Sequence, residues 1–127
     1  MQYLVVSLFL IGSVSAQTVS FSTSNLQGEN LTTPTSLQFG ADGRLYVAQQ
    51  DGLIKIYTIN RNGANNYLVT ATETITLIKN ITNHDDDGTV NATVNSRQVT
   101  GILLAGTSSN PIIYVTSSDP RIGGGFG

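Results

Sequence analysis

Hydrophobic and polar residues alternate along several short stretches of this chain, and turns rich in Gly, Asn and Asp separate the stretches. Alternation with a period of two places successive side chains on opposite faces of an extended strand. The clearest stretch is PTSLQFGADGRLYVAQQDGLIKIYTI, residues 34–59, which contains three such segments, at residues 36–39, 44–48 and 53–59. The adjacent residues Asp51 and Gly52 form a strong hairpin signal. We therefore expect three antiparallel strands in a tight meander.

Four further segments outside the meander are rich in Thr, Val and Ile, which suit a pleated sheet surface. They predict strands at residues 18–23, 67–79, 99–105 and 111–117. A helix over residues 70–77 is the alternative for part of the longest segment, but its density of β-branched residues favours a strand. The chain is therefore expected to be all-β.

An internal repeat relates the meander to the C-terminal part of the chain. The segment SLQF at residues 36–39 matches GILL at 101–104, and LYVAQQD at 45–51 matches IYVTSSD at 113–119. Repeated antiparallel meanders are typical of β-propellers, in which one blade cannot bury both of its faces alone. The spacing of the repeat exceeds the ~40–50 residues of compact blades, which predicts a long outer strand and a loop in the first blade. We expect about one and a half of the usual 4–8 propeller blades, and hence the N-terminal piece of a larger protein.

The alternation also selects the side chains that should form the core. We expect the repeated segments to be the inner strands of their blades, with their apolar face turned inward. Burial of apolar surface is the main favourable term in folding, so we expect the strands to pair in the registers that bury their apolar face. The predicted core residues are Leu37, Phe39, Leu45, Val47, Ile54, Ile56, Ile102, Leu104, Ile113 and Val115.

The N-terminus has the pattern of a signal peptide over residues 1–16. Residues 4–11 are continuously apolar except for one serine, and small residues at 14–16 precede the expected cleavage site before Gln17. The apolar segment is too short to cross a bilayer as a helix. A buried N-terminal strand or a retained anchor are the alternatives. The pattern predicts a secreted protein, extracellular or periplasmic, with a mature domain over residues 17–127 and no membrane segment after cleavage.

The charge and cysteine content narrow the class of protein. Eight acidic and six basic residues give a net charge of −2, and the basic residues are scattered along the sequence. This distribution excludes a nucleic-acid-binding patch from the expected functions. The chain has no cysteine, so even in an oxidising compartment its stability must come from the core and not from disulfides.

One acidic loop carries candidate chemistry. His84, the single histidine, precedes three aspartates, and a carboxylate neighbour would raise its pKa and suit a general base. A solvated loop histidine is the interpretation that we favour. Asn83, Asp85 and Asp87 resemble the start of a Ca²⁺ loop, but Val94 occupies the twelfth position, where an EF-hand requires Glu. A surface cation site of another kind remains an alternative.

Two other motifs have weaker implications. The run of glycines at 123–125 lacks the strand, helix and Lys of a phosphate-binding loop, and we interpret it as a flexible connection. Asn30, Asn80 and Asn91 each precede Thr by two positions and form glycosylation sequons.

The segments PTSLQFGADGRLYVAQQDGLIKIY (34–57) and RQVTGILLAGTSSNPIIYVTSSDPRIGGG (97–125) resemble the start of the glucose/sorbosone dehydrogenase family. The resemblance covers residues 31–125. It implies a secreted or periplasmic β-propeller, and the characterised soluble members use pyrroloquinoline quinone together with Ca²⁺. Gln98 could match the family's Gln that reaches the quinone, although one extra residue separates it from the following strand. The family's general-base His, its quinone-binding Arg residues and its Ca²⁺ ligands would belong to later blades.

Two functions follow as hypotheses. The first is the N-terminal part of a quinoprotein dehydrogenase for a small sugar or alcohol, which we expect to be inactive by itself. This chain then holds no catalytic residue, and neither the quinone nor Ca²⁺ should bind to it alone; Gln98 is its one candidate cofactor contact. The second is a non-catalytic extracellular propeller that binds carbohydrate or protein.

Overall fold

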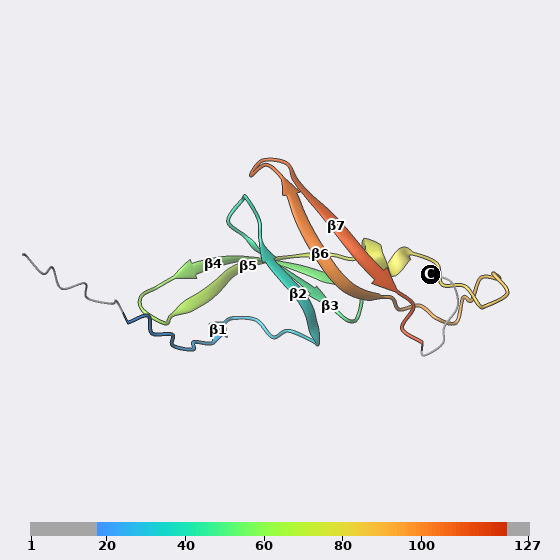
Figure 1. Cartoon of the computed structure of the whole chain (residues 1–127), viewed down its shortest axis with the longest axis horizontal. Coiled ribbons are helices and arrows are strands. Elements are labelled where there is room, and N and C mark those ends of the chain that lie inside the picture. The colour runs from blue at the N-terminus through green and yellow to red at the C-terminus, as the bar shows by residue number, and fades with distance from the viewer. Residues whose placement is uncertain (1–17, 122–127) are drawn as a thin grey trace, which may run out of the picture.

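The computed structural model describes residues 18–121, and these residues form an all-β protein (Figure 1). Five strands form a curled mixed sheet in the order β1–β5–β4–β3–β2, and β6 and β7 form a separate antiparallel pair. A short 3-10 helix, η1, follows β5. The elements are β1 (Leu26–Gln27), β2 (Pro34–Phe39), β3 (Leu45–Gln49), β4 (Ile54–Arg61), β5 (Tyr67–Ile75), η1 (Leu77–Asn80), β6 (Gln98–Gly106) and β7 (Pro111–Ser118).

The predicted meander is confirmed. Strands β2, β3, β4 and β5 are antiparallel neighbours, with Leu37 opposite Val47 and Leu45 opposite Tyr57. The β3–β4 turn closes with a hydrogen bond from the Gln49 amide to the Leu53 carbonyl. The pleat of β2, β3 and β4 therefore follows the alternation of the sequence.

One predicted strand is absent and another ends earlier than predicted. Residues 18–23 form no strand; the first strand is β1, which pairs in parallel with β5. All side chains from 18 to 23 are exposed, so their alternation has no surface to pack against. The long segment at 67–79 remains extended only to Ile75, and residues 77–80 then form η1. The helix considered over residues 70–77 is absent from this segment of the described chain.

The core lies on both faces of β3, whose five residues are all buried. On one face Leu45, Val47 and Tyr57 pack with partly buried residues of β1, β4 and β5. On the other face Ala48 and Ile54 pack with Val99 and with the β6–β7 hairpin. The structure thus confirms four predicted core residues as buried, Leu45, Val47, Ile54 and Ile56.

The inward face of β2 is opposite to the one predicted. Leu37 and Phe39 are 64% and 61% exposed, whereas Ser36 and Gln38 are half-buried against β6. The amide of Leu104 donates to Oε1 of Gln38 over 2.9 Å, and the amide of Ile102 donates to Oγ of Ser36 over 3.4 Å. Polar side chains point inward here because they accept hydrogen bonds from the neighbouring hairpin.

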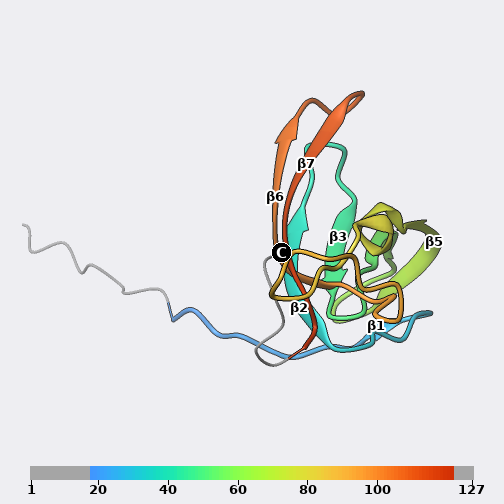
Figure 2. The same cartoon turned by 90° about the vertical axis from the view of Figure 1, so that its right-hand side faces the viewer.

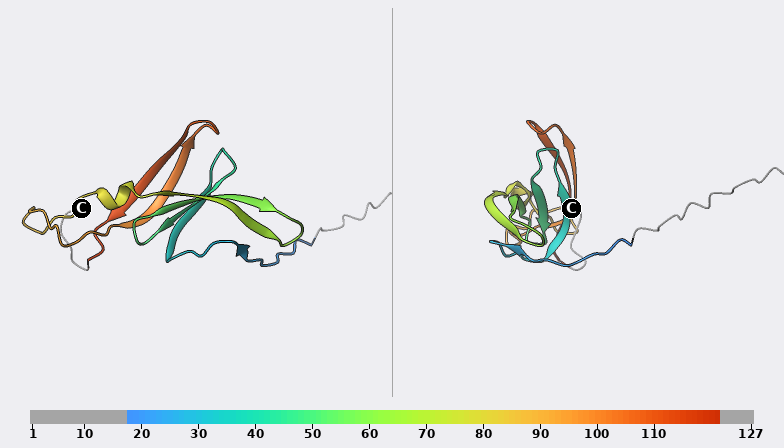
Figure 3. Two further views of the ribbon diagram at one scale, coloured as in Figure 1. Left: turned by 180° about the vertical axis from the view of Figure 1, so that it is seen from behind. Right: turned by 90° about the vertical axis from the view of Figure 1, so that its left-hand side faces the viewer.

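The β6–β7 hairpin keeps the predicted face inward. Its four predicted core residues, Ile102, Leu104, Ile113 and Val115, are half-buried, while the alternating residues Leu103 and Tyr114 are exposed. Figures 2 and 3 show the hairpin lying face-on across the edge of the sheet that holds β2 and β3. These four residues are only half-buried because β2 and β3 cover the hairpin on one face alone.

The internal repeat is reproduced in the strand registers. In the first hairpin Phe39 lies opposite Leu45, and at the matching place in the second hairpin Leu104 lies opposite Ile113. Both hairpins also have a bulge near the start of their first strand, between residues 34 and 36 and between residues 99 and 101. The two β-hairpins are therefore structural equivalents that stack face to face.

The predicted signal peptide at residues 1–16 and the glycine run at 123–125 lie outside the described residues. Among residues 18–121, no helix has the length and apolar character that a membrane crossing requires.

Candidate functional site

Gln98 lies at one end of the two stacked hairpins, where several chain segments meet. It is the first residue of β6 and pairs with Ser118 at the end of β7. The β3–β4 turn and the chain entering β2 reach the same end. Together these segments border a surface hollow of about 320 Å³, lined by Thr33, Gln50, Asp51, Ser96, Gln98 and Pro120.

Local hydrogen bonds fix the β3–β4 turn beside this hollow. The amide of Gln50 donates to the carbonyl of Thr33 over 3.0 Å, and Nε2 of buried Gln49 donates to the carbonyl of Thr32 over 3.1 Å. Oδ1 of Asp51 accepts the amide of Leu53 over 3.2 Å. The side chains of the turn are therefore presented from a fixed backbone.

Gly52 allows the β3–β4 turn to pack closely against the chain that leads into β6. Its φ is 84°, in the left-handed region that favours glycine. A Cβ at this position would clash with the carbonyl oxygen of Arg97, the residue before Gln98. Near it, Oγ1 of Thr35 donates to the carbonyl of Val99 over 2.7 Å. Sequence reasoning identified Gly52 only as a turn residue, because the contact joins segments far apart in the chain.

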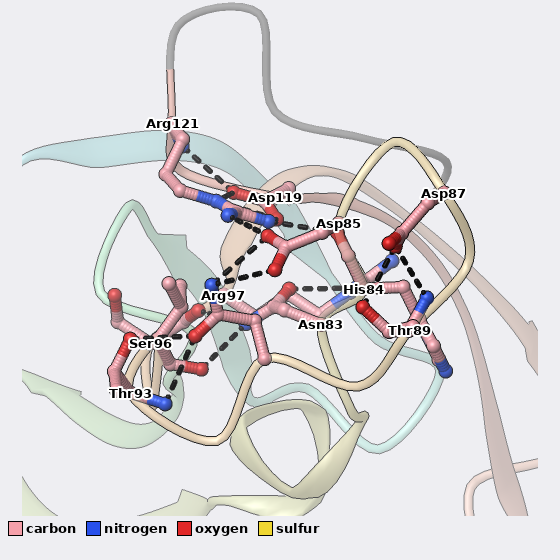
Figure 4. A network of polar contacts seen from close by, with 12 residues as sticks. Asn83, His84, Asp85, Asp87, Thr89, Thr93, Ser96, Arg97, Asp119 and Arg121 are labelled. Carbon is pink, nitrogen blue, oxygen red and sulfur yellow. Dashed lines mark hydrogen bonds and ion pairs between the residues drawn. The ribbon is translucent and has the colours of Figure 1, made fainter.

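A buried pair, Arg97 and Asn83, holds the long β5–β6 connection (Figure 4). The exposed fractions of Arg97 and Asn83 are 4% and 3%. Arg97 donates from Nη1 to Oδ1 of Asn83 and from Nε to Oγ of Ser117, both over 3.0 Å. Nδ2 of Asn83 in turn donates to the carbonyls of Val94 and Ser96. The buried guanidinium is thus oriented by neutral oxygens and serves to position the loop.

Arg121 joins the end of β7 to the acidic loop. Its guanidinium forms ion pairs of 2.6 Å with Asp119 and with Asp85, and it donates to the carbonyl of His84 over 2.8 Å. Hydrogen bonds from Arg121 lower the pKa of Asp119 to about 2. Hydrogen bonds from Asn91 and then from Arg121 lower the pKa of Asp85. Both carboxylates are therefore ionised at neutral pH and are directed at Arg121.

This arrangement bears on the two alternatives for the acidic loop. Asp87 accepts hydrogen bonds from the amide and hydroxyl of Thr89, so it points away from the Asp85 pair. Within residues 18–121, no group of three or more His, Cys, Asp or Glu side chains is placed to hold one metal ion. His84 is half-buried and enters the network through its backbone carbonyl. The loop network therefore gives Asp85 and Asp87 structural roles.

The groups around the hollow do not fit pyrroloquinoline quinone, which is a polycarboxylate. Carboxylates are bound most strongly by cations, above all by the guanidinium of Arg. The lining residues of the hollow include the carboxylate of Asp51 and no Lys or Arg. Arg97, the nearest basic residue in sequence, directs its guanidinium at Asn83 and Ser117.

The hollow offers neutral hydrogen-bonding groups and one carboxylate. Gln50 and Gln98 supply amide donors and acceptors, Thr33 and Ser96 supply hydroxyls, and Asp51 supplies an acceptor. Sequence reasoning found Gln98 alone, because the other residues join it only through the stacking of the hairpins. No family model matches the sequence, and no curated protein and no solved structure matches it.

Proposed function

We propose that this chain forms stacked blades of a secreted β-propeller and that the hollow beside Gln98 binds a small neutral polyhydroxy compound of the sugar class. The convergence of Gln50, Asp51 and Gln98 at the loop end of the hairpins carries the proposal. Face-to-face stacking of two hairpins with equivalent registers supports the propeller, since blades bury their faces against one another.

Sugar hydroxyls both donate and accept hydrogen bonds, and the hollow matches them with groups of both kinds. A side-chain amide provides two donors and an acceptor, and a carboxylate accepts from a hydroxyl. Because the hollow is open to water, each hydrogen bond should contribute about 0.5–1.5 kcal/mol. Three such bonds correspond to an affinity of ~1 mM or weaker. We therefore expect this part of the molecule to bind a sugar only weakly.

Oxidation of the bound sugar, as in glucose/sorbosone dehydrogenases, is the second candidate function. The position of Gln98 in a polar hollow favours it, because the resemblance assigns the quinone contact to that residue. Such chemistry needs cations for the quinone carboxylates and a general base beside the substrate. The described groups at the hollow include the carboxylate of Asp51 but supply no cation, so binding is the function that they support best.

A backbone-amide NMR titration with glucose tests the proposal on the full chain. We expect saturable shifts at Gln50, Asp51 and Gln98, and loss of those shifts in Gln98→Ala. Gln27→Ala, which alters an exposed glutamine on β1, is the matched control and should bind like the wild type. Shifts that Gln98→Ala leaves unchanged, or no shifts at ~100 mM glucose, would place sugar binding elsewhere or remove it.

Dye-coupled oxidation with added quinone and Ca²⁺ separates the two candidate functions. We expect no turnover from this chain alone. Turnover that Gln98→Ala abolishes and Gln27→Ala preserves would establish the dehydrogenase in place of the binding module.

A further inference from the structure

Each of the two hairpins leaves an apolar patch exposed. Leu37 and Phe39 form the β2 patch, on the face of β2 that points away from β6. Leu103 and Tyr114, each 59% exposed, form the hairpin patch, on the outer face of β6 and β7. Contiguous exposed apolar side chains of this kind are typical of interaction surfaces.

The packing inside the molecule shows what covers such surfaces. The inner face of the second hairpin, which carries Ile102 and Leu104, lies on the face of β2 that carries Ser36 and Gln38. Amides of β6 donate to both of these polar side chains. This is a contact between two different faces of two equivalent hairpins.

The internal repeat assigns each exposed patch to one side of that same contact. Leu37 and Phe39 occupy the places in the first hairpin that Ile102 and Leu104 occupy in the second. Leu103, in turn, stands at the place of Gln38. The β2 patch is therefore equivalent to the part of the covering face that β6 supplies, and the hairpin patch is equivalent to the covered face. The equivalents of Ile113 and Val115 in the first hairpin, Leu45 and Val47, are buried inside the molecule.

We propose that a second copy of this chain docks head to tail, with its β2 patch on the hairpin patch of the first copy, in a contact that follows the arrangement of β6 on β2. The register of the repeat places Leu37 of the second copy over Gly101, at the position equivalent to Ser36. A hollow of about 330 Å³ lies there, lined by Gly101, Ile102, Leu103, Tyr114, Val115 and Thr116. The missing side chain at Gly101 leaves room for an aliphatic group.

The chemistry of the hairpin patch suits this occupant. The exposed residues on the outer face of the second hairpin, among them Thr100, Leu103, Tyr114 and Thr116, are uncharged. Where the internal contact has Gln38, the hairpin patch has Leu103, so the contact between copies is more apolar. Because the two surfaces differ, the association is heterologous, and it either closes into a ring or continues as a fibre.

The test mixes two variants of the full chain in sedimentation velocity experiments. Phe39→Glu disables the β2 patch and Tyr114→Glu disables the hairpin patch, and each should weaken self-association at least ~10-fold. A mixture of the two should form a one-to-one dimer, since each variant retains the surface that the other lacks. Leu77→Glu, at an exposed leucine of η1 outside both patches, is the control and should assemble like the wild type.

A wild type that stays monomeric up to ~1 mM overturns the proposal. Association that persists in either single variant also overturns it, because another surface or the apolar N-terminus would then be responsible. Single variants that fail to complement each other indicate a two-fold symmetric contact and refute the head-to-tail geometry. A thermal midpoint below that of the wild type would show that Phe39→Glu or Tyr114→Glu destabilises the fold. In that case Leu37→Glu and Leu103→Glu are used in their place.

Discussion

Tyr57 and Tyr46 offer a direct comparison of two buried hydroxyls in neighbouring strands. Both side chains have an exposed fraction of 0%. The hydroxyl of Tyr57 has no hydrogen-bond partner among the described residues, and burial raises its pKa. The hydroxyl of Tyr46 donates to Oδ2 of Asp42 over 2.8 Å and accepts from Nη2 of Arg44 over 3.2 Å. The same one-atom deletion should therefore have opposite effects at the two positions.

The free energy of unfolding should rise in Tyr57→Phe. A buried polar group without a partner costs about 1–3 kcal/mol of desolvation, which the substitution removes. The aromatic ring stays in place, so packing against Leu45 and Val47 is kept. Tyr46→Phe should instead lose about 1.5–3 kcal/mol, the usual contribution of hydrogen bonds to charged groups.

Urea unfolding at neutral pH measures both changes. With a slope of about 1–3 kcal/mol per molar, the two unfolding midpoints should differ by roughly 1 M or more, with Tyr57→Phe the higher. A loss of about 1 kcal/mol or more in Tyr57→Phe would show that its hydroxyl has a partner, such as a buried water, and would refute this reasoning.

Other features of the structure give further predictions. Gly52→Ala should lose more stability than Gly88→Ala in urea unfolding, because both glycines have φ near 84° but only at Gly52 would a Cβ meet backbone, at the Arg97 carbonyl. The glycine conformation alone should cost about 1 kcal/mol, and equal losses would refute the contact. The pKa of Asp119 is depressed from 3.8 to about 2, so its stabilisation should be present above pH ~4 and lost as the pH falls towards ~2. Thermal midpoints measured over that range should show a shallower decline in Asp119→Asn, and an unchanged profile would contradict the ion pair with Arg121. Mass spectrometry of secreted protein should find Gln17 as its first residue, and an intact N-terminus would refute the signal peptide.

Local alternation was sufficient to predict the strands that pack on two neighbours. Leu45 and Val47 lie on one face of the sheet and Ile54 and Ile56 on the other, in strands with partners on both sides. Both faces are covered there, so apolar residues of either face are buried. Phe39, like Leu37, lies in the edge strand β2, whose inward face is decided by hydrogen bonds to the distant strand β6. That contact is invisible in a short window of sequence.

Less of the candidate site than of the fold can be predicted from the sequence. Only a family resemblance points to Gln98 in the sequence, and the structure places it in a polar hollow. Its neighbours Gln50 and Asp51 belong to a turn that any hairpin would need, and only the stacking of the hairpins gives them a second role. The sequence of the acidic loop allows a base or a cation site, but Arg121, 36 residues from Asp85, pairs with the Asp85 carboxylate.

The complete burial of β3 has a consequence for the order in which the chain opens. Its amides lie between β2 and β4, and its two faces are covered by separate hydrophobic clusters. Exchange of these amides with deuterium therefore requires the loss of both clusters together, so their protection should approach the global free energy of unfolding. The two-residue strand β1 pairs only with β5 and should exchange through local fraying. Protection measured strand by strand would thus locate the cooperative folding unit of the chain at β3.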